Sequence, residues 1–252
     1  MVNSPLTNKR ILITRAAQQV AETTALIEAK EATAIAFPCL EYQILKDSIQ
    51  QGLNFTKDYS DIVFTSVNGI QAVFENNLNS IVDDFQEKHI AVVGTKTAAA
   101  LKKYGLQASI IPKISSQQGL IQHYQEHGLP QSVLFFRAED GSDELLEYLQ
   151  KQGIKTRLVT AYRSFCPTDD NNEILTMLKE NSIDVALLGS SKTAAHYLQR
   201  IGNLELANRP VLVAISQQVA DAADKLGLKV QLIAKQANFP SMLESLAEYF
   251  SQ

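Results

Sequence analysis

The stretch Asp61-Ile62-Val63-Phe64-Thr65-Ser66 returns later in the chain as Asp184-Val185-Ala186-Leu187-Leu188-Gly189-Ser190. In each copy an aspartate precedes a short apolar run, and a serine follows shortly after it. An apolar run of this length between polar residues is typical of a strand buried on both faces. The serine is suited to cap a helix that starts directly after the strand. Both copies therefore predict a strand followed by a helix, the unit from which parallel sheets are built.

The repeat extends along the whole chain at a nearly constant spacing. The two aspartates are 123 residues apart, and Arg15 and Arg137, which follow two further apolar runs, are 122 apart. Gly105 and Gly227 are also 122 apart. A constant offset indicates an internal duplication of one unit of about 120 residues, a usual size for a domain.

Each copy predicts strands that alternate with helices. The predicted strands are 10–13, 33–37, 61–64, 90–93 and 108–111 in the first copy, and 132–136, 155–161, 184–188, 211–215 and 229–233 in the second. The segments 17–30 and 141–152 are predicted to be amphipathic helices. Gly105 and Gly227 suit the left-handed position that ends a helix. Such alternation predicts an α/β fold with parallel sheets covered by helices on both faces.

Two extended segments, 40–45 and 158–165, break this pattern at the joins between half-units. They are candidates for the connections between two lobes. The residues alone leave open whether the lobes are sequential halves of the chain or exchange their first strands.

Composition and charge narrow the class of protein. Of 252 residues, 45% are hydrophobic and 20% are charged, which is typical of a globular protein. The net charge of −4 argues against nucleic-acid binding but permits a local site for an anion. No apolar run approaches the roughly 20 residues that span a membrane, and the N-terminal residues lack the pattern of a secretion signal. We therefore predict a cytoplasmic protein whose Cys39 and Cys166 stay reduced.

Polar side chains gather where the predicted strands end, which is where open parallel sheets bind ligands. Hydroxyls and backbone N–H groups at a helix N-terminus favour a carboxylate or phosphate. For any single residue, capping of the helix is the alternative interpretation, and Ser66, Thr95 and Ser190 suit it. Repetition in both halves favours an anion-binding edge. The candidate binding residues are Thr14, Arg15, Thr65, Ser66, Thr97, Arg137, Ser190, Ser191, Ser216 and Gln217.

Tyr162 stands out because it lies in one of the two joining segments, within Ala161-Tyr162-Arg163-Ser164. Tyrosine is common in half-buried strands, so packing is one interpretation of it. The other is catalytic, because a phenol with a pKa near 10 can donate a proton to a leaving hydroxyl.

Other motifs argue against several kinds of site. The chain has no dinucleotide fingerprint, no phosphate-binding P-loop and no nucleophile elbow. His123 and His127 lie four residues apart on a predicted helix, but no third ligand is evident, so no metal site is predicted. Cys39 and Cys166 have no obvious activating partner and are predicted to be inert.

Five stretches together resemble the uroporphyrinogen-III synthase family, and the resemblance covers essentially the whole chain. They are Leu12-Ile13-Thr14-Arg15, Asp61-Ile62-Val63-Phe64-Thr65-Ser66, Val93-Gly94-Thr95-Lys96-Thr97-Ala98 with Leu101 and Gly105, Tyr162-Arg163, and Asp184 through Ser190. The resemblance implies two doubly wound lobes joined by a two-stranded β linker. The first lobe would be residues 1–39 plus 166–252, the second 46–157, and the linker strands 40–45 and 158–165.

The resemblance also implies an activity. The substrate would be hydroxymethylbilane, a linear tetrapyrrole with eight carboxylates, which is cyclised with loss of water and inversion of ring D. No cofactor or metal would take part, and the enzyme would be a monomer in transient contact with hydroxymethylbilane synthase. Tyr162 would assist loss of the hydroxyl, whereas Ser66, Ser190 and Thr97 would bind substrate. The guanidinium groups of Arg15 and Arg137 would pair with carboxylates.

The sequence departs from the family pattern at two places. Val219 stands where the second Gly-x-x-Thr-Ala motif has its threonine, and Gly141-Ser142-Asp143 lacks an arginine after the glycine. Val219 favours one alternative, a non-catalytic relative that senses a tetrapyrrole or another anion. A two-lobed sugar or amino-acid binding protein of the periplasmic kind and a nucleotide-sugar transferase are further alternatives. The missing export signal argues against the first of these two, and the missing diphosphate site against the second.

Overall fold

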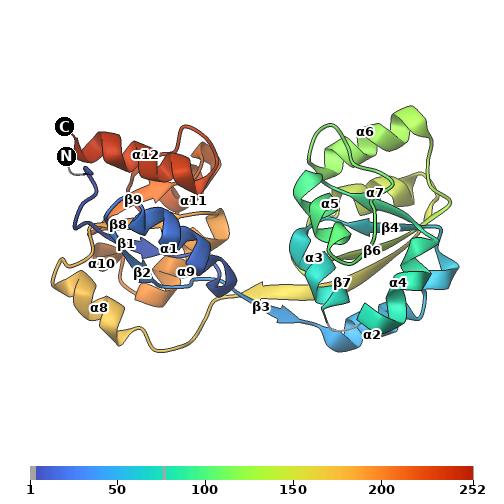
Figure 1. The fold of residues 1–252 in the computed structure, drawn as a ribbon, viewed down its shortest axis with the longest axis horizontal. Helices are drawn as coiled ribbons and strands as arrows, with labels where there is room; N and C mark the ends of the chain where they lie inside the picture. The colour runs from blue at the N-terminus through green and yellow to red at the C-terminus, as the bar shows by residue number, and fades with distance from the viewer. Residues whose placement is uncertain (1–3, 76–77, 252) are drawn as a thin grey trace. The chain divides into compact units, whose positions relative to one another are not determined.

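Two five-stranded sheets organise the chain into two units (Figure 1). The computed structural model describes residues 4–75 and 78–251. Unit 1 comprises the chain up to Glu41 and from Phe165 onward, whereas unit 2 is Tyr42–Ser164. The sequence prediction of an α/β fold with parallel sheets is confirmed.

The strands of the two sheets alternate with helices along the chain. The strands are β1 (Arg10–Ile13), β2 (Thr33–Ala36), β3 (Glu41–Ile44), β4 (Asp61–Phe64), β5 (His89–Val92), β6 (Ser132–Ala138), β7 (Lys155–Phe165), β8 (Val185–Leu188), β9 (Val211–Ala214) and β10 (Val230–Ile233). The helices are η1 (Ala17–Gln19), α1 (Val20–Glu28), α2 (Lys46–Leu53), η2 (Thr56–Asp58), α3 (Val67–Phe74), α4 (Leu78–Gln86), α5 (Thr95–Lys102), α6 (Gln117–His127), α7 (Glu144–Lys151), α8 (Asn172–Lys179), α9 (Ser191–Ile201), α10 (Leu204–Ala207), α11 (Gln217–Asp224) and α12 (Phe239–Phe250).

Each sheet combines strands from both copies of the sequence repeat. The order is β10-β9-β8-β1-β2 in unit 1 and β3-β7-β6-β4-β5 in unit 2. Thus β1 and β2 join the later strands of the second copy, while β6 and β7 join β4 and β5 of the first. The central pairs are parallel and match in register, with Ile11 opposite Val185 and Val133 opposite Asp61. The two copies exchange their first strand-helix-strand segments.

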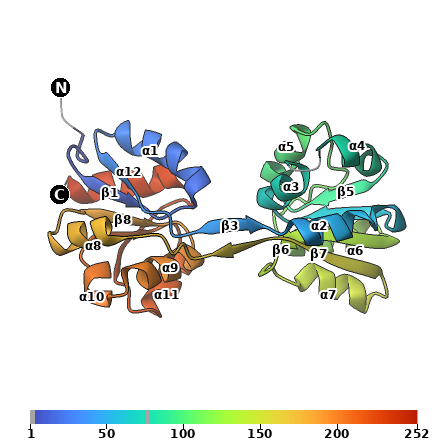
Figure 2. The same cartoon turned by 90° about the horizontal axis from the view of Figure 1, so that it is seen from below.

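Alternation along the strands directs side chains to the two faces of each sheet. In β1, Ile11 and Ile13 pack with α1 and α12, whereas Leu12 packs in the cluster that includes α9 and α11. Figure 2 shows α1 and α12 on one side of this sheet and α8 to α11 on the other. Both faces are covered, as the apolar strands predict.

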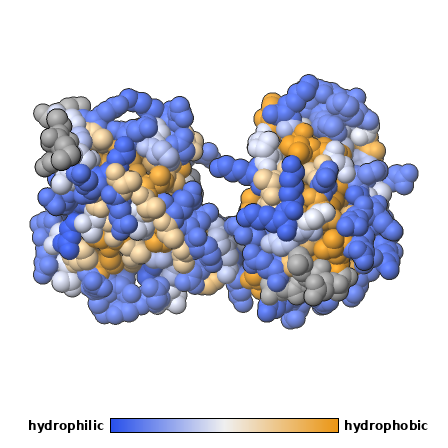
Figure 3. Space-filling view, in the orientation of Figure 1, coloured by the Kyte–Doolittle hydropathy of each residue, from blue (hydrophilic) through white to orange (hydrophobic). Residues whose placement is uncertain are grey.

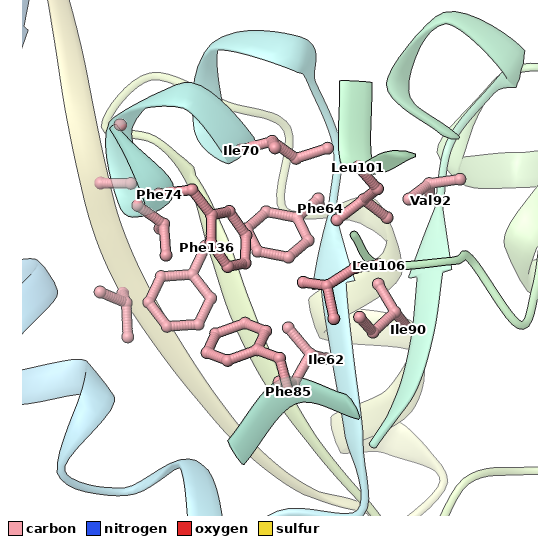
Figure 4. Packing of buried hydrophobic residues seen from close by; sticks show 14 of the residues in the cluster. Ile62, Phe64, Ile70, Phe74, Phe85, Ile90, Val92, Leu101, Leu106 and Phe136 are labelled. Atoms are coloured by element: carbon pink, nitrogen blue, oxygen red, sulfur yellow. The ribbon is translucent and has the colours of Figure 1, made fainter. Parts of the chain in front are cut away.

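Aromatic rings fill the larger core of unit 2 (Figure 4). Phe64 lies at its centre, stacked on Phe136 at 5.6 Å and on Phe85 at 6.2 Å between ring centroids. Phe74 meets Phe85 edge-on at 5.1 Å. Each buried ring contributes about 1.5–3 kcal/mol of transfer free energy. The end of β4 is therefore firmly held, which matters because the next residues are polar candidates.

The two predicted helix-ending glycines have the left-handed conformation, with φ of 73° at Gly105 and 83° at Gly227. In both, the N–H of the following leucine donates to a carbonyl five residues back, as in a Schellman motif (Leu106 to Leu101, Leu228 to Ala223). This prediction is confirmed at both sites.

Several predicted elements differ from the structure. The predicted strand 108–111 is only a single bridge between Ile110 and Ala91. Pro112 follows directly, has no N–H to donate, and so cannot extend the pairing. The strand predicted over 155–161 continues without a break to Phe165. The helices α2, α4, α8 and α10 were not predicted.

In the view of Figure 3, hydrophilic side chains dominate the outline of both units. Among the helices of the described residues, none has the length and apolar character needed to cross a membrane.

Candidate functional site

A bulge in unit 2 sets the direction of Tyr162. Arg137 of β6 lies opposite Thr160, but the next residue, Ala138, lies opposite Tyr162, so Ala161 is an extra residue on β7. Bulges re-aim side chains in this way. As a result Ala161 and Tyr162 both belong to the same buried cluster, although they are adjacent in the strand.

The hydroxyl of Tyr162 meets the start of helix α3. Its Oη lies 3.0 Å from Oγ of Ser66, and the Asn68 side chain is close enough to affect its acidity. Ser66 is the N-cap of α3 and accepts the N–H of Gly69 at 3.1 Å. The cap therefore holds the serine oxygen in place while it contacts the tyrosine.

Burial shapes the acidity of Tyr162, whose side chain is only 7% exposed. Loss of hydration raises the pKa of its phenol above the usual value, and the nearby Tyr42 adds to the rise. The contacts with Ser66 and Asn68 act in the opposite direction. The Tyr42 ring meets the Tyr162 ring edge-on, with centroids 5.7 Å apart. Tyr162 therefore holds its proton at neutral pH, as a proton donor must, while burial makes it a weaker acid than a free phenol.

Three other predicted residues of unit 2 lie at strand-to-helix junctions. Thr65 is half-buried directly after β4, and Thr97 is 6% exposed in the first turn of α5. Arg137 is 3% exposed and bonds to the Gly141 carbonyl and the Asp143 carboxylate within its own loop. A Cβ on Gly141 would lie 2.6 Å from the Arg137 Nη1, so this glycine makes room for the guanidinium.

In unit 1, Thr14 and Arg15 make contacts inside the unit. The Thr14 hydroxyl is fully buried and donates to the Leu187 carbonyl at 2.5 Å, tying β1 to β8. The Arg15 guanidinium lies 4.1 Å above the Phe239 ring and pairs with Glu22 at 3.2 Å. Both side chains were predicted to bind a ligand at the strand ends of this sheet, and in the structure both stabilise unit 1 there.

Ser190 and Ser191 begin helix α9 of unit 1. Ser190 caps it in a reciprocal box with Thr193, in which each side chain binds the backbone of the other. Ser191 lines a groove of about 670 Å³ with Gln218, Asp221, Ala222, Lys225 and Leu226.

The predicted residues Ser216 and Gln217 begin helix α11 of the same unit. Ser216 occupies the N-cap without a side-chain capping bond. Gln217 is exposed, and its amide donates to Asp221 at 2.7 Å.

Thus the structure brings Tyr162 and Ser66 together in unit 2, and Ser190, Ser191, Ser216 and Gln217 to the corresponding edge of unit 1. Tyr42 was not predicted from the sequence, and Asn68 was not among the candidate binding residues. Asn68 lies two residues after Ser66 in the polar stretch that follows β4, and this position was the available signal. Tyr42 lies in the other joining segment, and no motif marks it.

Other possible sites lie elsewhere. In the described part of the chain, no group of three or more His, Cys, Asp or Glu is placed to hold a metal ion. The His123 and His127 rings stack at 4.3 Å, and hollows of about 170 and 370 Å³ lie beside them on α6.

Both cysteines are free, and burial raises the pKa of each thiol. An unreactive thiol is the expected consequence.

A family model and similar proteins all indicate the same family for this chain. A family model described as uroporphyrinogen-III synthase HemD matches residues 21–244. A uroporphyrinogen-III synthase from Chlorobaculum parvum is 26% identical over 95% of this chain and 98% of its own length. One from Synechococcus elongatus is 27% identical over 100% of this chain and 99% of its own.

Solved structures share the fold. A mutant uroporphyrinogen III synthase from the extremely thermophilic bacterium Thermus thermophilus aligns with 96% of this chain and 99% of its own, with a TM-score of 0.64 at 16% identity. Uroporphyrinogen-III synthetase from Helicobacter pylori gives the same values. At this identity the likeness shows the fold alone.

Proposed function

This chain belongs to the uroporphyrinogen-III synthase family, and from that premise we propose which of its residues carry out the family's reaction. The enzyme closes hydroxymethylbilane into uroporphyrinogen III with loss of water and inversion of ring D. The reaction needs an acid for the leaving hydroxyl and contacts that orient a flexible polyanion.

Tyr162 is the acid in this proposal. Its O–H proton passes to the hydroxyl of hydroxymethylbilane, the C–O bond breaks with its electron pair on oxygen, and water leaves. The tyrosinate that remains is stabilised by a hydrogen bond from Ser66 and by the nearby Asn68 side chain. The proton that the substrate releases when the closed ring restores its pyrroles returns to Tyr162. Atoms and charge then balance over the cycle.

The substrate carboxylates are bound by hydroxyls and helix N-termini rather than by a basic surface. In this proposal Thr65, Ser66, Ser190, Ser191, Ser216 and Gln217 contact substrate. These residues lie at the starts of α3, α9 and α11, where backbone N–H groups favour anions. Such contacts suit a protein of net charge −4.

A supporting role is proposed for four residues that bond or pack within their own unit. Thr14 and Arg15 hold the edge of unit 1, and Arg137 holds the loop after β6. Thr97 is buried in the first turn of α5.

The single observation that carries the proposal is the contact between Tyr162 and Ser66 at 3.0 Å. It joins the buried, protonated phenol of Tyr162 to the serine that caps helix α3 at the end of strand β4. This is the kind of preorganised donor pair that stabilises a developing charge.

A coupled assay tests the activity. The purified protein is supplied with hydroxymethylbilane by its synthase, and the oxidised products are resolved into isomers I and III. We expect mostly isomer III from the wild type. A product that matches the enzyme-free reaction, which gives isomer I, would instead favour a non-catalytic tetrapyrrole-binding protein.

The assignment of Tyr162 needs a matched control. We expect Tyr162→Phe to lower the rate of isomer III formation about 100-fold or more, the usual contribution of a general acid. Tyr197→Phe is the control, because Tyr197 is also buried but donates to the Ala207 carbonyl in unit 1. It should lose stability and keep the wild-type isomer ratio.

We also propose that the chain acts as a monomer in the cytoplasm and receives substrate in transient contact with hydroxymethylbilane synthase. Because free hydroxymethylbilane closes spontaneously to isomer I, a short transfer would limit that loss. Light scattering, cell fractionation and cross-linking during turnover test the three parts. A stable dimer, a membrane-bound pool or absence of cross-links would contradict the corresponding part.

A further inference from the structure

The caps of helices α3 and α9 have nearly the same backbone. Ser66 has φ −155° and ψ 158°, and Ser190 has φ −163° and ψ 161°. Each serine oxygen accepts the N–H three residues later at 3.1 Å. The residue that supplies this N–H differs, because it is Gly69 in unit 2 and Thr193 in unit 1.

In unit 1 the Thr193 hydroxyl occupies the cap. Its Oγ1 accepts the Ser190 N–H at 2.9 Å and lies 2.9 Å from the Ser190 carbonyl, to which it donates. Thr193 has one hydroxyl proton, and the carbonyl takes it. The contact of 3.1 Å between the two hydroxyl oxygens must therefore use the proton of Ser190. The Ser190 proton is then directed to Thr193.

In unit 2 the corresponding side chain is missing. Gly69 offers no hydroxyl, so the Ser66 proton has no partner at this position of the cap. The Tyr162 oxygen lies 3.0 Å away. A phenol oxygen has two lone pairs and one proton, so it can accept from Ser66 and still donate its own proton elsewhere.

We propose that Gly69 is a positioning residue for catalysis: by leaving the Ser66 proton free, it lets Ser66 donate to Tyr162, whose own proton is then directed to substrate. This inference rests on the proposed role of Tyr162. It identifies the position, Gly69 in unit 2 and Thr193 in unit 1, at which the two duplicated strand-end edges differ chemically. The edge of unit 2 can support an acid, whereas the Ser190 cap of unit 1 cannot supply the donor that such an acid needs.

Space at Gly69 allows a direct test. A Cβ there would lie 3.4 Å from the Ser66 oxygen and 3.2 Å from the Phe136 carbonyl oxygen, so a hydroxyl on it would reach the serine with slight crowding. Gly69→Thr and Gly69→Val crowd the site equally and differ only in that hydroxyl. The pKa of Tyr162 is measured in each by spectrophotometric titration against the same variant carrying Tyr162→Phe. The isomer ratio, kcat and KM are measured in parallel.

We expect Gly69→Thr to raise the Tyr162 pKa by about one unit relative to Gly69→Val. Its kcat for isomer III should fall about tenfold relative to Gly69→Val, with KM unchanged. Equal pKa values and equal kcat in the two variants would overturn the inference. If this pair fails to fold, Gly69→Ser and Gly69→Ala repeat the comparison with less bulk, and the same outcomes decide it.

The two proposals fail in different ways. If the wild type forms no isomer III, the proposed activity fails, but the pKa comparison still decides whether Gly69 controls the hydrogen bonding of Tyr162. If Tyr162→Phe abolishes isomer III and the Gly69 pair shows no difference, only the inference about Gly69 fails.

Discussion

The strand-end edges of the two units share a backbone plan and differ in their hydrogen-bonding partners. Ser66 and Ser190 cap equivalent helices after equivalent strands, yet Ser66 contacts Tyr162 and Ser190 is bound by Thr193. The difference lies in the third residue of each helix. Whether a capping serine is purely structural or takes part in chemistry is thus decided by a neighbour and not by the serine.

The next pair of helices shows the reverse pattern. Helix α5 has Gly94 as its N-cap and Thr97 in its third position, whereas α11 has Ser216 as its N-cap and Val219 there. Thr97 is 6% exposed and Val219 is 5% exposed. A position this buried faces the core, so the valine that departs from the family pattern removes no hydroxyl exposed to a ligand.

Replacement of the two duplicated arginines should have the largest and most unequal effects on the stability of the protein. Arg137→Ala should lower the free energy of unfolding by about 2–4 kcal/mol, because removal of the buried guanidinium leaves the Gly141 carbonyl without its partner. Arg15→Ala should cost about 1–2 kcal/mol, since its partner Glu22 is exposed and mainly the packing on Phe239 is lost. Urea denaturation followed by circular dichroism measures both. Equal losses would show that the two arginines are equivalent.

The two capping serines should have equal structural effects and unequal chemical ones. Ser66→Ala and Ser190→Ala should each lose about 1 kcal/mol of stability, the usual value of an N-cap. Only Ser66→Ala should raise the Tyr162 pKa and lower kcat for isomer III, because only it removes a donor to the phenol. Ser190→Ala removes a proposed substrate contact and should act on KM, so a matching fall in kcat at equal stability would contradict this division of roles.

Two buried tyrosines offer a smaller comparison. Tyr197 of unit 1 donates to a carbonyl at 2.9 Å, whereas the Tyr124 hydroxyl of unit 2 finds no partner among the described residues. Tyr197→Phe should therefore cost about 1 kcal/mol, and Tyr124→Phe should be neutral or slightly stabilising. Thermal unfolding at neutral pH distinguishes them. A larger loss for Tyr124→Phe would reveal a partner for its hydroxyl.

The same tyrosines predict a dependence on alkaline pH. Burial raises the pKa of Tyr124 and of Tyr197, so the folded state keeps these protons at a pH where the unfolded chain loses them. Stability from each group is fully present below the unfolded pKa of about 10 and falls as pH rises above it. Each Phe variant should make that fall less steep. An unchanged slope in both variants would contradict the assignment.

Much of the fold could be predicted from the sequence, because its strands are apolar runs bounded by polar residues. The range of β4 and the left-handed conformations of Gly105 and Gly227 followed directly from residue types. The strand expected at 108–111 failed where Pro112 ends the pairing. The exchange of strands between the copies could not be read from the residues, because both connectivities place the same apolar faces in a core.

The site was harder to predict for a different reason. The sequence marks which side chains lie at strand ends, but not which of them are already bonded within the unit, as Arg15 and Arg137 are. The bulge at Ala161 is also hidden in an unremarkable strand sequence. Because that bulge re-aims Tyr162 toward Ser66, the contact between them could be found only in the structure.

The most direct test of the role of Tyr162 is the rate of isomer III formation by Tyr162→Phe, measured beside Tyr197→Phe and the wild type with hydroxymethylbilane supplied by its synthase. We expect a folded Tyr162→Phe protein whose products revert to isomer I, while Tyr197→Phe keeps the wild-type ratio. A folded Tyr162→Phe protein that still makes isomer III at the wild-type rate would contradict the assignment of Tyr162 as the acid.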